Sequence, residues 1–218
     1  MTSAVTLALV AIVPLVLLAL TSFVKISVVL SLVRNALGTP DAPSSLVVTG
    51  LSLVLTFFVM APVALDMARA AEAPASTSPA QSVEPWHALV PADLQGPLDQ
   101  VERGLGPLRT FLSKHAGAKD KATFVELAAK LGHQDVHGDE LWVLAPAFVT
   151  SELRAAFMMA IIIFIPFLVI DLVVALGLAS LGLATTPPQT IALPMKLLLF
   201  VAVDGWRLLI DSLLRGYA

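Results

Sequence analysis

The sequence predicts an all-α, membrane-associated fold in which two long helical hairpins flank a small helical middle domain. Three observations support this prediction. Hydrophobic residues make up 57% of the 218-residue chain and charged residues only 13%, whereas soluble domains have about 25% charged residues. Long apolar segments form both ends of the chain, and a polar stretch separates them. Turns rich in proline and glycine divide each apolar end into two arms.

The first hairpin is expected over residues 1–65. Residues 1–24 contain no charge, and residues 46–65 form a second uncharged run. Each run can cross about 30 Å of hydrocarbon at roughly 1.5 Å per residue. The sequence GTPDAPSS at 38–45 is typical of a turn and would join the two arms. No basic residue precedes the first apolar run, as a secretory signal would require, so we expect that run to be retained.

The middle domain is expected over residues 66–145. Its segment 71–85, AEAPASTSPAQSVEP, has the low-complexity composition of a flexible loop. Two short helices should follow. One would be opened by Pro107 and closed by Gly117. The other would begin at a capping box of Thr123 and Glu126 and stop at Gly132.

The second hairpin is expected over residues 146–218, with arms at 146–184 and 191–215. The sequence ATTPPQT separates these arms, because paired prolines cannot continue a helix. Counting basic residues near the short loops places Lys25 and Arg34 on the cytoplasmic side, and the acidic middle domain is then expected in the periplasm.

Composition argues against several functional classes. The net charge of −3 lacks the clustered basic residues that nucleic acid requires, and the absence of cysteine excludes disulfides and thiol catalysis. His133 and His137 lie four residues apart, but the neighbouring glycines favour a solvated acidic loop over a metal site. Nucleophile-elbow and phosphate-loop motifs are absent. We therefore expect no enzymatic activity, no metal and no cofactor.

Charged residues in apolar surroundings are the most informative feature. A charge at the centre of a bilayer costs about 2.5–3.5 kcal/mol or more, so such residues usually face protein or water. Snorkelling at helix ends accounts for Arg34 and Arg207, but it fits Lys25 and Asp171 poorly. We predict that the buried or inter-subunit charges are Lys25, Arg34, Asp171, Lys196, Asp204 and Arg207.

Positions along the second hairpin suggest how Asp171 is neutralised. Asp171 lies 14 residues before the turn at 185–190, about 21 Å away in a helix, whereas Lys196 is only six residues past that turn. In one straight hairpin these two residues cannot meet, so we predict that Asp171 pairs with Arg207 or with Lys25 of the other hairpin. The last helix should carry alternating charges on one face, as an interface or as an ordinary solvated surface: Asp204, Arg207, Asp211 and Arg215.

Several stretches resemble the FliP/SctR family (also YscR/HrcR) of type III secretion proteins. In the terminal hairpins they are TSFVKISVVLSLVRNALGTP, GLSLVLTFFVMAPV, APAFVTSELRAAF, IFIPFLVIDLVVA and PPQTIALPMKLLLFVAVDGWRLL. PLRTFLSKH and FVELA are similar to the middle domain of that family. The resemblance runs in the correct order over nearly the whole chain.

The resemblance implies a structural pore subunit of the type III secretion export apparatus. Five copies would assemble with S-type and T-type subunits around the pore through which unfolded substrate polypeptides cross the bacterial inner membrane. U-type switch and V-type export proteins would be further partners, and the chain would be multi-pass, touch lipid and extend to the periplasmic side. Its apolar helices would pack largely on one another, so Lys25 and Arg34 need not face lipid. The absence of a basic leader favours an injectisome over a flagellum.

One departure from the family concerns the loop that seals the pore. Family members often place methionines just before the paired prolines, and methionine deforms easily around a passing chain. The resemblance maps this loop onto four smaller or stiffer residues: Leu183, Ala184, Thr185 and Thr186. Either the seal is weaker here or another element supplies it, with Met158 and Met159 as candidates.

Two other functional classes are compatible with broken apolar helices. A small secondary transporter would use the intramembrane charges to bind a solute near the midplane. The two hairpins do not read as sequence repeats, which weakens that alternative. A membrane scaffold without a pore would need no polar groups within its helices.

Overall fold

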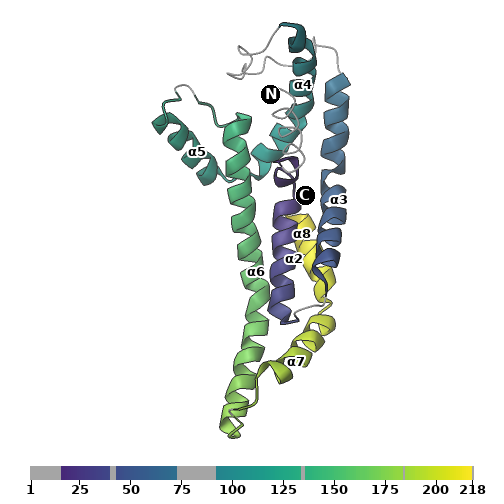
Figure 1. The fold of residues 1–218 in the computed structure, drawn as a ribbon, viewed down its shortest axis with the longest axis vertical. Coiled ribbons are helices and arrows are strands. Elements are labelled where there is room, and N and C mark those ends of the chain that lie inside the picture. The colour runs from purple at the N-terminus through teal and green to yellow at the C-terminus, as the bar shows by residue number, and fades with distance from the viewer. Residues whose placement is uncertain (1–15, 40–42, 73–91, 134–135, 184, 218) are drawn as a thin grey trace, which may run out of the picture. The chain divides into compact units, whose positions relative to one another are not determined.

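The computed structural model describes residues 16–39, 43–72, 92–133, 136–183 and 185–217, with the backbone alone at 92–100. In these residues every regular element is a helix (Figure 1), which confirms the all-α prediction. Residues Met60–Glu152, with the described residues before Ser22, form one compact unit, which we call the polar unit. Residues Ser22–Val59 and Leu153–Ala218 form the other, which we call the apolar unit.

Helix α2 (Phe23–Leu37) is the first long helix of the described chain. Its buried residues include Ile26, Val29, Leu30 and Val33, which recur at helical spacing on one face. Gly38 ends the helix with φ 76° and donates its amide to the Asn35 carbonyl. The predicted first arm at 1–24 lies mostly outside the described residues. Lys25 lies in the first turn of α2 and not at the end of that arm, because residues 20–22 form a turn that interrupts the helix before it.

Helix α3 (Ser45–Glu72) runs past the predicted end of the first hairpin at residue 65. It continues through Pro62 and over an alanine-rich segment, whose high helix propensity explains the extension. An exposed Arg69–Asp66 ion pair of 3.1 Å lies in this extension. The predicted flexible loop at 71–85 is therefore helical at its first two residues, and the rest of it lies outside the described residues.

The helices of the polar unit begin earlier than predicted. Helix α4 (Ala92–His115) contains Pro107 in its interior, where packing of the buried residues Leu108, Phe111 and Leu112 compensates for the missing amide. Helix α5 (Ala118–Lys130) follows the extended residue Gly117.

The predicted capping box in α5 is wrong. Thr123 lies inside the helix and donates its hydroxyl to the Lys119 carbonyl at 2.9 Å. Glu126 forms an ion pair of 2.6 Å with Lys130. Local helix formers before Thr123 extend the helix by a turn, whereas the predicted stop at Gly132 is confirmed by its φ of 92°.

Helix α6 (Leu141–Ser180) is a continuous helix of 40 residues. Its first turns pack in the core of the polar unit, where the rings of Phe148 and Phe111 lie 5.8 Å apart. Helices α3 and α6 are both long and apolar enough to cross a membrane, with mean hydropathies of 2.3 and 2.9 over their most apolar 18 residues. The chain buries only 22% and 17% of their most apolar segments, so most of that surface is available to lipid or to another chain.

The predicted last arm at 191–215 is not one helix. Helix α7 (Gln189–Ala202) and helix α8 (Gly205–Arg215) are separated by a sharp elbow at Val203 and Asp204 (Figure 1). Asp204 adopts the left-handed conformation, φ 52° and ψ 50°, which aspartate tolerates better than most residues. Gly205 allows the elbow to close, because a Cβ at this position would overlap the Phe200 ring.

Candidate functional site

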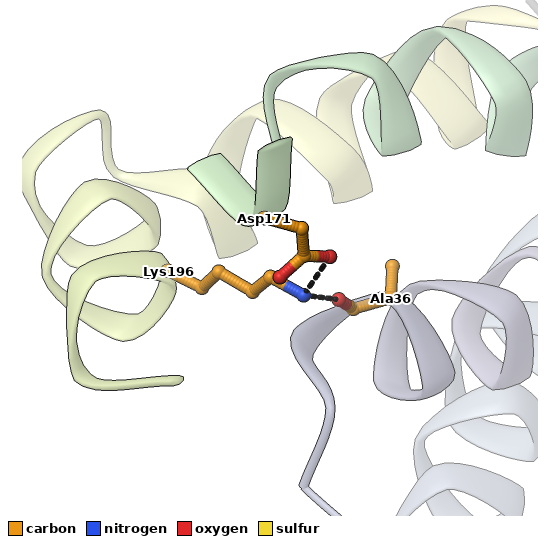
Figure 2. A network of polar contacts seen from close by, with 3 residues as sticks. All are labelled: Ala36, Asp171 and Lys196. Carbon is orange, nitrogen blue, oxygen red and sulfur yellow. Dashed lines mark hydrogen bonds and ion pairs between the residues drawn. The ribbon is translucent and has the colours of Figure 1, made fainter. Parts of the chain in front are cut away.

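The buried charges of the apolar unit form two small polar clusters. In the first, the Lys196 ammonium donates to Asp171 Oδ2 at 2.7 Å and to the Ala36 carbonyl at 3.3 Å (Figure 2). The Lys196 side chain is 9% exposed and that of Asp171 is 43% exposed. The Ala36 carbonyl belongs to the last turn of α2, where carbonyls lack helical partners and attract cations. One lysine therefore ties the end of α2 to α6 and α7.

This ion pair contradicts the prediction that Asp171 pairs with Arg207 or Lys25 because Lys196 cannot reach it. The prediction assigned a helical rise to every residue up to the turn. In the structure α6 ends at Ser180 and α7 begins at Gln189, so the intervening residues add no helical length. Asp171 then lies about 14 Å from the end of α6, and Lys196 lies about 10 Å from the start of α7. A lysine side chain is long enough to span this difference.

Lys25 forms the second cluster. This residue is 4% exposed, and its ammonium lies 3.7 Å from the centre of the Tyr217 ring. A cation over a desolvated aromatic face is stabilised by about 2 kcal/mol. The partner predicted for Lys25 was the acidic Asp171; the structure instead places the ring of Tyr217, the single tyrosine of the sequence, over its ammonium.

The other predicted charges lie nearer the surface of the chain. Arg34 is half-buried in the last turn of α2, and Arg207 is exposed in the first turn of α8. Asp204 is exposed at the elbow, outside any helix, so it does not continue the predicted charged face of the last helix.

The remaining two charges of that face form an exposed ion pair in α8. Arg215 Nε donates to Asp211 Oδ2 at 2.6 Å. This hydrogen bond, with the positive charges of Arg215 and Arg207, lowers the pKa of Asp211 below its ordinary value. Because both side chains are largely exposed, the pair marks a solvated side of α8 in the single chain.

The predicted sealing loop lies in the turn between α6 and α7. Leu183 and Thr185 are exposed, Thr186 is half-buried, and Ala184 lies outside the described residues. The Thr186 amide donates to the Leu183 carbonyl at 3.0 Å. Met158 is exposed and Met159 is half-buried, both in α6. The part of either set in a seal stays a prediction.

The polar unit contains a hydrogen-bonded cluster that the sequence analysis missed. Ser151 Oγ accepts from the Gly117 amide at 2.7 Å and lies 2.6 Å from Asp120 Oδ2 and 2.8 Å from the Ala147 carbonyl. Asp120 is buried. These hydrogen bonds connect the turn between α4 and α5 to α6. Ser151 lies 34 residues from Gly117 and 31 residues from Asp120 in the sequence, so no local motif identifies the cluster.

Two apolar hollows lie in the apolar unit. One, of about 230 Å³, is lined by residues of α6, α7 and α8 and of the elbow, with Ser212 as its one polar lining residue. The other, of about 550 Å³, lies between α2 and α6, with Asn35 as its one polar lining residue. Neither hollow offers a charged group. Among the described residues no group of three or more histidine or acidic side chains is placed to hold a metal ion.

Comparison with known proteins identifies the family. The sequence model of the FliP family matches residues 6–213. The chain is 46% identical over 204 residues to the flagellar biosynthetic protein FliP of Pectobacterium carotovorum subsp. carotovorum, a match that covers 94% of this chain and 73% of that protein. It spans about half the length of the FliP proteins of Buchnera aphidicola that it matches.

Other relatives are named for secretion or for translocation. The chain is 37% identical over 212 residues to the hypersensitivity response secretion protein HrcR of Ralstonia nicotianae, with 95% of this chain and 93% of that protein covered. It is 38% identical over 220 residues to the Yop proteins translocation protein R of Yersinia pestis, with 98% and 94% covered. The resemblance seen in the sequence is therefore confirmed, and the chain belongs to the FliP family.

Proposed function

We propose that the chain is a structural subunit of the type III secretion export apparatus, in which it forms part of the gate for unfolded substrate proteins. The observation that carries this proposal is the family match over residues 6–213, together with relatives named for flagellar biosynthesis, secretion and translocation. These names describe one export machinery in different cellular settings.

The surface of the chain supports a role inside an assembly. Large apolar side chains are exposed on both long helices, among them Phe57, Phe58, Ile162 and Leu172. A surface of this kind needs lipid or protein to cover it. In contrast, the charges deepest in the apolar unit, Lys25 and Lys196, have contacts within the chain. The helices can therefore pack against neighbours without leaving these ammonium groups exposed to an apolar environment.

Assembly and location follow from the family resemblance as proposals. Five copies associate with S-type and T-type subunits, and with U-type switch and V-type export proteins, around a pore for secreted polypeptides. Helices α3 and α6 support a multi-pass location at the bacterial inner membrane, in contact with lipid and extending toward the periplasm. No nucleic acid takes part.

The proposed subunit serves an injectisome in preference to a flagellum. Relatives named for secretion and translocation, at 37% and 38% identity over 95% and 98% of this chain, are compatible with this assignment. Sequence identity is higher to the flagellar relative, at 46%. A complementation test in flagellar and injectisome mutants separates the two.

The proposed role is structural and not catalytic, and the described residues also argue against a transporter. A solute site needs charged groups that face a cavity near the midplane. Lys196 and Asp171 instead bind one another and the end of α2. The two apolar hollows hold a single polar lining residue each, so neither is suited to a charged solute.

Native mass tests the proposal first. We would purify the chain in detergent, alone and with co-expressed partner subunits, and measure the mass of the complex by native mass spectrometry. The gate predicts a species of five times the 22.9 kDa chain, with added steps for the smaller partners. A stable monomer or dimer under both conditions would overturn the gate, and competition between solutes for uptake would then test the transporter.

A further inference from the structure

The segment that follows α8 is fixed to the first turn of α2. Tyr217 is 9% exposed and lies with its ring face over the Lys25 ammonium, 3.7 Å from the ring centre. Its hydroxyl donates to the Ser22 carbonyl at 3.5 Å. Both partners of this contact belong to the apolar unit, although they are almost the whole chain apart.

The residue before Tyr217 also packs against Lys25. A Cβ at Gly216 would lie 3.3 Å from the Lys25 ammonium, so the backbone before Tyr217 also packs against that group. The electron-rich ring face is an interaction that a buried ammonium can make in place of water. Removing the ring would therefore loosen the end of α8 and also admit water to the ammonium.

The opposite end of α8 is an elbow. Asp204 is the one non-glycine residue with positive φ in the described chain, and such a conformation costs about 1–2 kcal/mol for a residue with a side chain. Next to it, Gly205 rests on the Phe200 ring, and that ring contacts Trp206 edge-on at 5.3 Å. This elbow supplies a defined pivot for α8.

Between the two ends, α8 covers apolar surface. Leu209 and Leu213 are buried, while Arg207 and Asp211 on other faces of the helix are exposed. The hollow of about 230 Å³ lies beneath α8, against α6 and α7. Incomplete packing under the helix means that its position depends strongly on the attachments at its ends.

We propose that the contact between Tyr217 and Lys25 is a latch. While it is made, it holds α8 against α6 and α7; when it breaks, α8 can pivot about the elbow at Asp204. This inference concerns the conformation of the single chain and goes beyond the proposed export function. Release of the latch would uncover the first turn of α2 and free α8 to pivot.

Ser22 is a suitable reporter for the latch. Its hydroxyl is fully buried next to Tyr217 and has no hydrogen-bond partner, so Ser22→Cys removes no polar contact. The chain contains no cysteine, so the introduced thiol is unique. We would follow the labelling of this thiol by N-ethylmaleimide in the full-length chain in detergent. Its rate measures how often the latch opens.

Three variants on the Ser22→Cys background test the contact. Tyr217→Leu and Lys25→Met should each raise the labelling rate by about tenfold or more, because both remove the interaction between the cation and the ring. Tyr217→Phe retains the ring over the ammonium and should stay within about twofold of the parent. The matched control is Arg215→Gln, which changes an exposed residue of the same helix and should leave the rate unchanged.

A second reporter separates local opening from general loss of stability. Ser52 is fully buried in α3, where its hydroxyl donates to the Val48 carbonyl. Labelling of Ser52→Cys should not respond to Tyr217→Leu. Any of three results would overturn the latch. Tyr217→Leu could raise the labelling rate of Ser52→Cys as much as that of Ser22→Cys, or leave the rate of Ser22→Cys unchanged. The third result is fast labelling of Ser22→Cys in the parent chain. If circular dichroism shows that Lys25→Met does not fold, the labelling rate of Tyr217→Leu alone tests the latch.

Discussion

The partners in the ion pair between Lys196 and Asp171 differ in their access to water. The lysine side chain is 9% exposed and the aspartate side chain 43% exposed. Removing one partner of a buried pair costs mainly because the remaining charge is left without compensation. The cost should therefore depend on which partner remains.

This asymmetry is testable by two single substitutions. Asp171→Ala leaves the buried ammonium with the Ala36 carbonyl and should destabilise the chain by about 2–3 kcal/mol. Lys196→Met leaves a carboxylate that water can reach and should cost about 1 kcal/mol. Unfolding by SDS, followed by circular dichroism, measures both. Equal losses, or a larger loss for Lys196→Met, would contradict the arrangement in Figure 2.

The exchange of the two residues offers a stricter test. In Asp171→Lys combined with Lys196→Asp the ion pair is restored, but the carboxylate now faces the Ala36 carbonyl. Because two acceptors repel, the double variant should recover only part of the lost stability. Full recovery would mean that the contact with Ala36 contributes nothing.

The helix boundaries show which local sequence signals predict the start and end of a helix correctly. Gly132 ends a helix as predicted, and Gly38 begins the predicted turn directly after α2; both adopt the left-handed conformation, which glycine reaches freely. Pro107 and Thr123 failed as helix starts, because each signal also fits a helix interior when the preceding residues favour helix. The elbow at Asp204 was missed because apolar residues continue up to Val203, although Asp-Gly is a recognised turn sequence.

Helix α5 provides a prediction that separates its two possible starts. The capping box requires that Thr123→Ala cost about 1 kcal/mol. In the structure Thr123 is exposed within the helix, and the loss should be below about 0.5 kcal/mol. Ser151→Ala should instead cost about 1–3 kcal/mol, because the buried Asp120 carboxylate and the Gly117 amide each lose a hydrogen bond. Thermal unfolding of both variants measures the difference, and a larger loss for Thr123→Ala would restore the capping box.

The turn between α6 and α7 yields a functional prediction. If residues 183–186 ring the pore, then Thr185→Met adds a longer and more deformable side chain at an exposed position of that ring. The ion current through an opened gate, recorded in a planar bilayer, should fall. Ser180→Met, on the exposed end of α6 just before the turn, is the matched control and should have little effect. Equal conductance of Thr185→Met and the parent would remove this turn from the seal.

For the whole chain, composition and motif order predicted the fold class and family, but not the partners of the buried charges. An ion pair between residues 25 positions apart, or a ring contact between residues 25 and 217, depends on where helices end and bend. Hydrophobic periodicity specifies which faces are buried and not what lies opposite a given side chain. Of the six charges predicted to be buried or between subunits, Lys25 and Lys196 are buried within the chain, and their contacts could not be predicted without the positions of the helix ends.

The exposed apolar surface of α3 and α6 leads to the last prediction, which concerns assembly. A gate requires that neighbouring chains cover part of this surface, and a carboxylate introduced there would be buried without a partner. Phe57→Asp, at a side chain that is 77% exposed in the single chain, should therefore abolish the five-chain species in detergent. Detergent solvates the variant chain itself, so the monomer should remain helical by circular dichroism.

The control for this substitution is Glu126→Ala, on an exposed and polar part of α5. It should assemble like the parent chain. Lipid contact and chain contact at Phe57 predict different results, because an aspartate that faces lipid costs roughly 2.5–3.5 kcal/mol at insertion and leaves the oligomer of the inserted chains intact. A five-chain complex of normal mass but low yield would assign this face of α3 to lipid. Loss of the complex at normal yield would assign it to the neighbouring subunit.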